Sequence, residues 1–193
     1  MLALVLDNYD SFVYNIVDYL ARLGIKSIVV RNDEIKPRAV ERIRPDMIII
    51  SPGPGNPLNR RDIGVSGEVV RIYGPKTPVL GVCLGHQVIG LVFGAKIRRA
   101  RTIRHGKLSP VEHYSGNLYR GIPRVFRAMR YHSLVIDEVP SEALEVNAGS
   151  LDDRKIMGVR HVEHPIHGVQ FHPESIGTGY GLDILRNFVD NPY

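Results

Sequence analysis

The only cysteine of the chain, Cys83, stands where an apolar stretch of strand length, residues 79–82, changes into an apolar helical run. Gly81 and Gly85 flank it, which suits a tight turn where a substrate can approach the backbone. A thiol on a strand-to-helix turn, in a chain that also holds distant histidines, predicts nucleophilic catalysis. The alternative is a small apolar side chain packed beneath a sheet.

A histidine and a carboxylate two residues apart form the second candidate group. We expect a strand over residues 167–171 that leads directly into His172, with Glu174 two residues further on. In an extended segment these two positions project to the same side, so Glu174 can fix the tautomer and orientation of the imidazole. Because an ordinary thiol is mostly protonated near neutral pH, Cys83 needs such a base. These residues form a candidate triad, although the tripeptide alone also fits an ordinary surface loop.

Other histidines are weaker candidates for the base. His86 lies three residues after Cys83 but has no acidic neighbour in sequence, and we expect it to pack against the sheet. His161, His164 and His167 are spaced by three, but a proline between them interrupts any helix that would align them. No carboxylate or cysteine completes a ligand set, so we predict no metal site in this chain.

A Gly/Pro-rich loop at residues 52–57 follows an apolar stretch at 47–50. Such a loop can bring backbone N–H groups close to a ligand without obstruction by side chains. We predict that the N–H groups of Gly55 and Leu84, the residue after the cysteine, form an oxyanion hole. A rigid turn is the alternative. The loop is neither a Walker phosphate loop nor a dinucleotide fingerprint, so phosphate binding is disfavoured.

Apolar segments of strand length alternate with helical patterns over the first half of the chain. We expect buried strands over residues 2–6, 27–30, 47–50 and 79–82, and helices over 12–23, 37–44 and 67–73. Strands without polar alternation, separated by helices, predict an α/β fold with an open, mostly parallel sheet and helices on both faces. In such a sheet the candidate residues that follow strands lie at one edge, where ligands bind.

The second half of the chain has shorter segments and turn signals, at 115–117 and 121–123. This pattern predicts a smaller antiparallel β section over residues 95–136. Later elements are expected as strands over 144–147 and 156–159 and a closing helix over 181–189.

Composition fits a single domain spanning residues 1–193, with 44% hydrophobic and 23% charged residues. The formal net charge is +5, but the basic residues are spread along the chain and accompany no nucleic-acid motif. Residues 98–104, here called the basic strip, are expected to face solvent or a partner. We expect no signal peptide, no membrane span and no internal disulfide, and therefore a cytoplasmic protein.

Three segments taken together, GVCLGHQ at 81–87, SPGPGNP at 51–57 and GVQFHPES at 168–175, resemble the triad-type class I glutamine amidotransferases over essentially the whole chain. The resemblance implies the flavodoxin-like fold of that family and a catalytic triad of Cys83, His172 and Glu174. The glutamine-binding positions that it implies are Gly53, Pro54, Gly55, Gln87, Ser133 and Leu134.

Two further segments, DNYDSF at 7–12 and HGK at 105–107, resemble the glutaminase subunits of anthranilate synthase and aminodeoxychorismate synthase. The resemblance implies hydrolysis of glutamine through a γ-glutamyl thioester on Cys83, with ammonia passing to a separate chorismate-using synthase subunit in a hetero-oligomer. Magnesium would belong to that partner, and no cofactor is expected in this chain. Anthranilate for tryptophan synthesis, aminodeoxychorismate for folate synthesis, and a subunit shared by both remain open, as does a non-catalytic regulatory module of the same fold.

Overall fold

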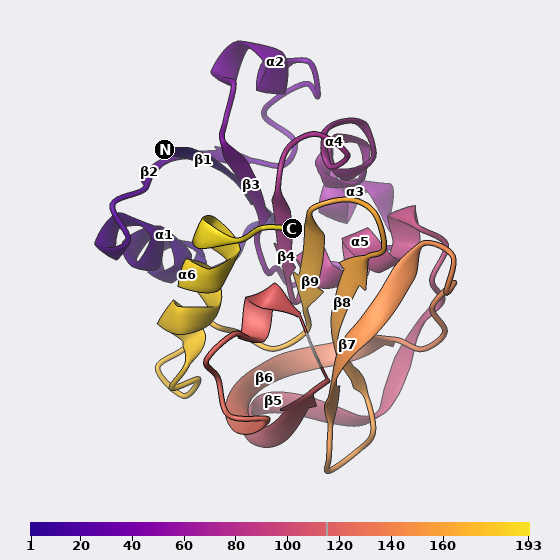
Figure 1. Ribbon diagram of the computed structural model, residues 1–193. Helices are drawn as coiled ribbons and strands as arrows, with labels where there is room; N and C mark the ends of the chain where they lie inside the picture. The colour runs from indigo at the N-terminus through magenta and orange to yellow at the C-terminus, as the bar shows by residue number, and fades with distance from the viewer. Residues whose placement is uncertain (115) are drawn as a thin grey trace.

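The computed structural model describes residues 1–114 and 116–193, so Ser115, in the predicted turn at 115–117, lies outside the described residues. The fold is built on a nine-stranded sheet in the order β2-β1-β3-β4-β9-β8-β7-β5-β6 (Figure 1). The strands are β1 Leu2–Asp7, β2 Lys26–Arg31, β3 Met47–Ile50, β4 Val79–Val82, β5 Ile97–His113, β6 Val125–Ile136, β7 Leu144–Ser150, β8 Ile156–His161 and β9 Ile166–Val169. The helices are α1 Val13–Arg22, α2 Ala39–Ile43, α3 Arg60–Ile63, α4 Ser66–Tyr73, α5 Leu84–Val92 and α6 Gly181–Asp190, with a 3₁₀ turn, η1, at Asn117–Tyr119.

The sheet has a parallel and an antiparallel part. β2, β1, β3, β4 and β9 pair in parallel, whereas β8, β7, β5 and β6 continue the same sheet with antiparallel pairings. The predicted α/β fold is confirmed. Because β1, β3 and β4 are adjacent and parallel, the segments that follow them lie at one edge of the sheet, as the sequence predicts.

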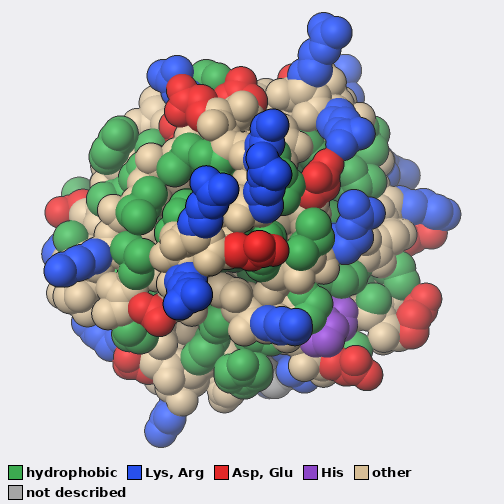
Figure 2. Space-filling model, turned by 90° about the horizontal axis from the view of Figure 1, so that it is seen from above, with side chains coloured by type: hydrophobic (Ala, Val, Ile, Leu, Met, Phe, Trp, Pro, Cys, Tyr) green, Lys and Arg blue, Asp and Glu red, His purple; other side chains and the backbone are tan. Residues whose placement is uncertain are grey.

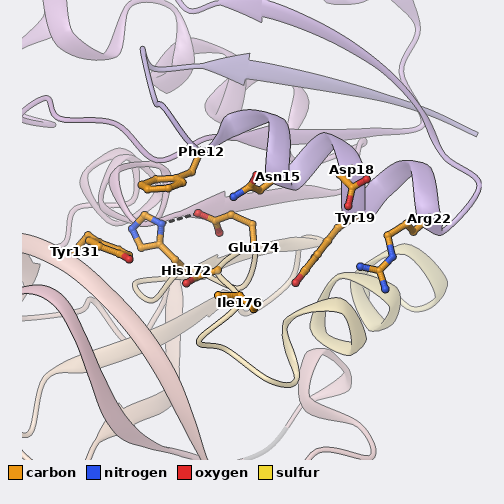
Figure 3. A pocket seen from close by; sticks show the side chains of 10 residues that line it. Phe12, Asn15, Asp18, Tyr19, Arg22, Tyr131, His172, Glu174 and Ile176 are labelled. Carbon is orange, nitrogen blue, oxygen red and sulfur yellow. Dashed lines mark hydrogen bonds and ion pairs between the residues drawn. The ribbon is translucent and has the colours of Figure 1, made fainter.

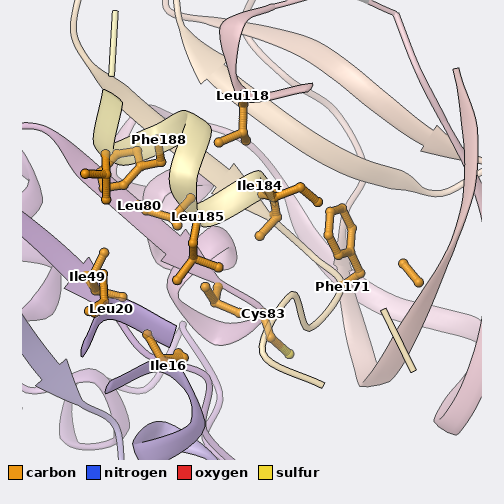
Figure 4. Packing of buried hydrophobic residues seen from close by; sticks show 14 of the residues in the cluster. Ile16, Leu20, Ile49, Leu80, Cys83, Leu118, Phe171, Ile184, Leu185 and Phe188 are labelled. Carbon is orange, nitrogen blue, oxygen red and sulfur yellow. The ribbon is translucent and has the colours of Figure 1, made fainter. Parts of the chain in front are cut away.

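Two apolar cores cover the two faces of the parallel part, and alternate strand residues enter each. In β3, Met47 and Ile49 belong to the core beneath α1 and α6, whereas Ile48 and Ile50 belong to the core beneath α4 and α5. Figure 4 shows the first of these cores, with Cys83 at its margin. Since both faces are covered, the strands need no polar alternation.

Two strand predictions were wrong in detail. β2 is not a buried strand: Ile28 is 39% exposed, because β2 lies at the edge of the sheet with β1 as its one neighbouring strand. The strand predicted over 167–171 is β9, which ends at Val169. His172 therefore lies in the loop beyond the strand, where it forms an isolated bridge with Met129 of β6.

The short helix α3 was not predicted. It has four residues, and Asn59 caps it by accepting a hydrogen bond from the Arg61 N–H at 3.2 Å. A single turn of this kind has too little apolar periodicity to detect, so the capping residue was the one available signal.

Charged side chains are mixed over the surface. On the face shown in Figure 2, Lys and Arg side chains are dispersed among Asp, Glu and apolar residues instead of forming one continuous basic patch. None of the helices in the described ranges combines the length and the apolar character needed to cross a bilayer.

Candidate active site

The turn between β4 and α5 holds Cys83 in a strained conformation, with φ 51° and ψ −98°. Its backbone N–H donates to the Val169 carbonyl oxygen at 2.8 Å, which ties the turn to the end of β9. A Cβ on Gly81 would lie 2.4 Å from the Gly85 carbonyl oxygen, and one on Gly85 would lie 2.3 Å from that of Ile50. The two glycines therefore make room for a turn that presents a side chain at the sheet edge.

The loop after β9 places a buried imidazole against a buried carboxylate. His172 Nδ1 lies 2.6 Å from Glu174 Oε1 (Figure 3), and the two residues are 3% and 2% exposed. The backbone of His172 is held from both sides, because its N–H donates to Met129 O at 2.9 Å and its carbonyl accepts from Thr178 Oγ1 at 2.7 Å. With Nδ1 engaged by the carboxylate, Nε2 is the nitrogen left for proton transfer.

Charge around the imidazole favours its protonated form. Burial alone lowers the pKa of His172, but a negative charge on Cys83 and the Glu174 carboxylate outweigh burial and hold that pKa well above its ordinary value. His172 Nε2 has no hydrogen-bond partner within the described residues, and His172 and Cys83 line one cavity of about 220 Å³. The arrangement can therefore support an imidazolium beside a thiolate.

A smaller cavity of about 90 Å³ is also lined by Cys83. A Cβ on Gly53 would lie 2.4 Å from the Asn8 carbonyl oxygen, so the Gly/Pro loop packs closely against the segment after β1. The cavity brings together every position assigned from sequence to glutamine binding or to the oxyanion hole. It is lined by Gly53, Pro54, Gly55, Cys83, Leu84, Gln87, Tyr131, His132, Ser133 and Leu134.

Sequence reasoning missed Gln170, whose Nε2 donates to Cys83 Sγ at 3.6 Å. Gln170 is fully buried, and its other amide atom, Oε1, accepts from Gln87 Nε2 at 3.1 Å. The premise of an extended segment through Glu174 was wrong, because β9 ends at Val169 and residues 173 and 174 form a turn. The one available signal for Gln170 was its place between the end of β9 and His172.

Asp10 was also missed. It lines the cavity shared by Cys83 and His172. Burial, together with the nearby Glu174 carboxylate, raises the pKa of Asp10 to about 6, although His172 opposes the rise. A carboxyl with a pKa raised to about 6 therefore lies close to the candidate triad, and its charge depends on the charges of Glu174 and His172.

Replacing Asp10 with asparagine should flatten the pH dependence of stability. Between its ordinary pKa of 3.8 and its folded pKa of about 6, the folded state binds more protons at this group than the unfolded state. The free energy of unfolding therefore falls as pH rises through this window. We expect Asp10→Asn to remove about 1 kcal/mol of that fall, since partial solvent contact reduces the effect.

Urea unfolding of wild type and Asp10→Asn at several pH values between 4 and 7 measures this difference. Asp18→Asn, an exposed aspartate on the neighbouring helix α1, is the matched control and should follow wild type. If the two variants give parallel profiles, the assignment of the shift to Asp10 is wrong.

The rival histidines lie elsewhere. His86 is fully buried against Gly168, neither ring nitrogen has a partner in the described part of the chain, and burial lowers its pKa to about 3. The rings of His161 and His164 stack at 4.3 Å, whereas His167 Nε2 lies 2.9 Å from Pro192 O. Within residues 1–114 and 116–193, no group of three or more His, Cys, Asp or Glu side chains is arranged to hold a metal ion.

Comparison with known proteins finds one matching family and similar proteins along almost the whole chain. The family described as "Glutamine amidotransferase class-I" matches residues 4–191. Anthranilate synthase component 2 of Saccharolobus solfataricus is 57% identical over 192 residues, which are 98% of each chain. Aminodeoxychorismate/anthranilate synthase component 2 of Bacillus subtilis is 43% identical over 97% of this chain and 95% of its own. The crystal structure of a putative GMP synthase protein from Thermoplasma acidophilum has a TM-score of 0.89 and 29% identity, covering 98% of this chain and 92% of its own.

Proposed function

The chain belongs to the class I glutamine amidotransferases, and from that premise we propose that it is the glutaminase subunit of an anthranilate synthase. The observation that carries the proposal is the pair of cavities that meet at Cys83. One is lined by the positions assigned to glutamine, and the other by the histidine that can exchange a proton with the thiol. Relatives of nearly the same length that bear this name support the choice of synthase.

In the proposed reaction, the Cys83 thiolate attacks the side-chain amide carbon of glutamine. The backbone N–H groups of Gly55 and Leu84 stabilise the oxyanion that forms. His172 Nε2 then gives its proton to the leaving nitrogen, and ammonia departs from a γ-glutamyl thioester. A water molecule loses a proton to His172 and attacks the thioester, which releases glutamate and restores the Cys83 thiolate beside a protonated His172. Glu174 holds the imidazole in place and stabilises its positive charge.

Ammonia is then used by a second subunit in the proposed complex. We propose a chorismate-using synthase as that partner, in a hetero-oligomer located in the cytoplasm, with magnesium in the partner and no cofactor in this chain. Part of the basic strip is neutralised within the chain, because Arg98 pairs with Asp137 at 2.6 Å and Arg104 with Asp152 at 3.0 Å. Arg99 and Arg101 are exposed, so they are the cations of the strip best placed to contact a partner.

Reconstitution with each type of synthase subunit tests the pathway. We expect glutamine and chorismate to give anthranilate when the chain is combined with the anthranilate synthase partner from the same organism. Formation of aminodeoxychorismate with the other partner as well would show a shared subunit, as the name of the Bacillus subtilis relative indicates for that protein. Glutamine-dependent product with the aminodeoxychorismate partner alone would contradict the anthranilate assignment.

A further inference from the structure

Arg130 is a charged residue whose side chain is fully buried, and it lies outside the triad. Its guanidinium is neutralised from one side, because Nη2 lies 2.9 Å from Asp153 Oδ2 and Nη1 lies 3.3 Å from Asp152 Oδ1. Nη1 also donates to Ser109 Oγ at 3.0 Å. Burying a cation is costly, and a hydrophobic residue of similar volume often serves stability as well. The position therefore calls for a reason beyond stability.

The opposite edge of the guanidinium fixes the tautomer of a second buried side chain, His132. Arg130 Nε donates to His132 Nε2 at 3.0 Å, so Nε2 is an acceptor and the ring proton is on Nδ1. Burial, with the positive charge of Arg130, lowers the pKa of His132 to about 3, which keeps the ring neutral. Nδ1, 3.0 Å from the Leu134 carbonyl oxygen, then donates to it.

The Leu134 carbonyl connects this pair to the cavity assigned to glutamine. It accepts a second hydrogen bond from Gln87 Nε2 at 2.9 Å. Because a carbonyl can only accept, it sets the orientation of the Gln87 amide, whose Nε2 also donates to Gln170 Oε1. That bond in turn directs Gln170 Nε2 to Cys83 Sγ. The side-chain Oε1 of Gln87 is thereby left for a ligand in the cavity.

We propose that Arg130 is a positioning residue for glutamine binding: by fixing the tautomer of His132 it holds the Leu134 carbonyl and the Gln87 amide in the arrangement that accepts the substrate. This inference rests on the proposed function. The effect should fall mainly on glutamine affinity, because Arg130 acts first on Leu134 and Gln87, which line the cavity assigned to glutamine, and reaches Cys83 only through the further bond to Gln170. Synthesis from added ammonia, which bypasses glutamine, should be untouched.

The test uses the complete complex with its synthase partner. We expect Arg130→Met to raise the KM for glutamine about 10- to 100-fold with a much smaller change in kcat. His132→Phe should raise the KM in the same way, since it removes the hydrogen bond from Arg130 and the hydrogen bond to the Leu134 carbonyl. His132→Asn should raise the KM for glutamine much less than His132→Phe, because the introduced side-chain amide can still donate to the Leu134 carbonyl. Arg104 also pairs with Asp152 and Asp153, which leaves those carboxylates a cation when Arg130 is replaced.

Arg160→Met is the control for loss of a paired arginine from the sheet, because Arg160 of β8 pairs with Glu145 of β7 at 2.5 Å and lines neither cavity. It should leave the KM at the wild-type value. A lower melting temperature with an unchanged KM in Arg130→Met would show a purely structural role and overturn the inference. If that variant does not fold, an unchanged KM in His132→Phe overturns it. A wild-type complex without glutaminase activity would instead overturn the proposed function, and the inference with it.

Discussion

Replacement of Cys83 with serine should abolish glutamine-dependent synthesis by the complex and leave synthesis from added ammonium salt intact. We expect the glutamine-dependent rate to fall at least about 10³-fold, as when other nucleophiles of this type are removed. The reason lies in the pair that Cys83 forms with His172, whose pKa is held high partly by a negative charge on the sulfur. A serine hydroxyl has a far higher pKa than a thiol and does not supply that charge.

Both rates are measured on one preparation of the complex, with glutamine or with ammonium as the nitrogen source. Serine fits the same turn, so the fold and the interface should persist. Loss of both activities would show that Cys83 has a structural role. In parallel, a glutamine-like affinity label applied to the wild-type complex should modify this chain at Cys83, its single thiol, and an unlabelled Cys83 would contradict the assignment.

The predictable part of the fold is the part that both cores bury. The strand bounds 47–50 and 79–82 match β3 and β4, because strands covered on both faces appear in sequence as unbroken apolar runs. The predicted burial of β2 and the predicted strand end beyond Val169 were wrong. Whether a strand lies at an edge, and where pairing stops, depends on the order of strands in the sheet, which the apolar pattern does not contain.

The residues of the candidate site also divide into those that local sequence signals predict and those that they do not. Cys83, His172 and the Gly/Pro loop could be assigned because glycines, prolines and the short spacing of His172 and Glu174 are local signals. Arg130 could not, since in sequence it resembles any other basic residue of a strand. Its burial and the neutralisation of its charge come from the loop that carries Asp152 and Asp153. This loop follows β7, a strand that pairs with β5 next to β6. Contacts of this kind arise from the assembled sheet alone.

Glu174 offers the sharpest separation of activity from stability. Its side chain is fully buried, Oε1 is 2.6 Å from His172 Nδ1, and Oε2 has no partner among the described residues. The unpaired oxygen makes this buried carboxylate costly to the fold, but its pairing with His172 offsets part of that cost, and losing one charge of a buried pair is destabilising. Because Glu174→Gln keeps the shape of the side chain and an oxygen that accepts from His172 Nδ1, we expect it to lower the free energy of unfolding by about 1 to 3 kcal/mol, which leaves the chain folded.

The same substitution should be severe for catalysis. Without the carboxylate, the imidazolium of His172 loses part of its stabilisation. The side-chain amide introduced at position 174 can also hold the imidazole in the wrong tautomer. We therefore expect kcat to fall about 10²- to 10⁴-fold. Glutamine hydrolysis by the complex and urea unfolding of the chain measure the two effects. Glu174→Asp, which keeps the charge on a shorter side chain, should retain more activity than Glu174→Gln. If the two variants lose activity equally, the charge of Glu174 is not what the triad requires, and its role reduces to filling the space behind His172.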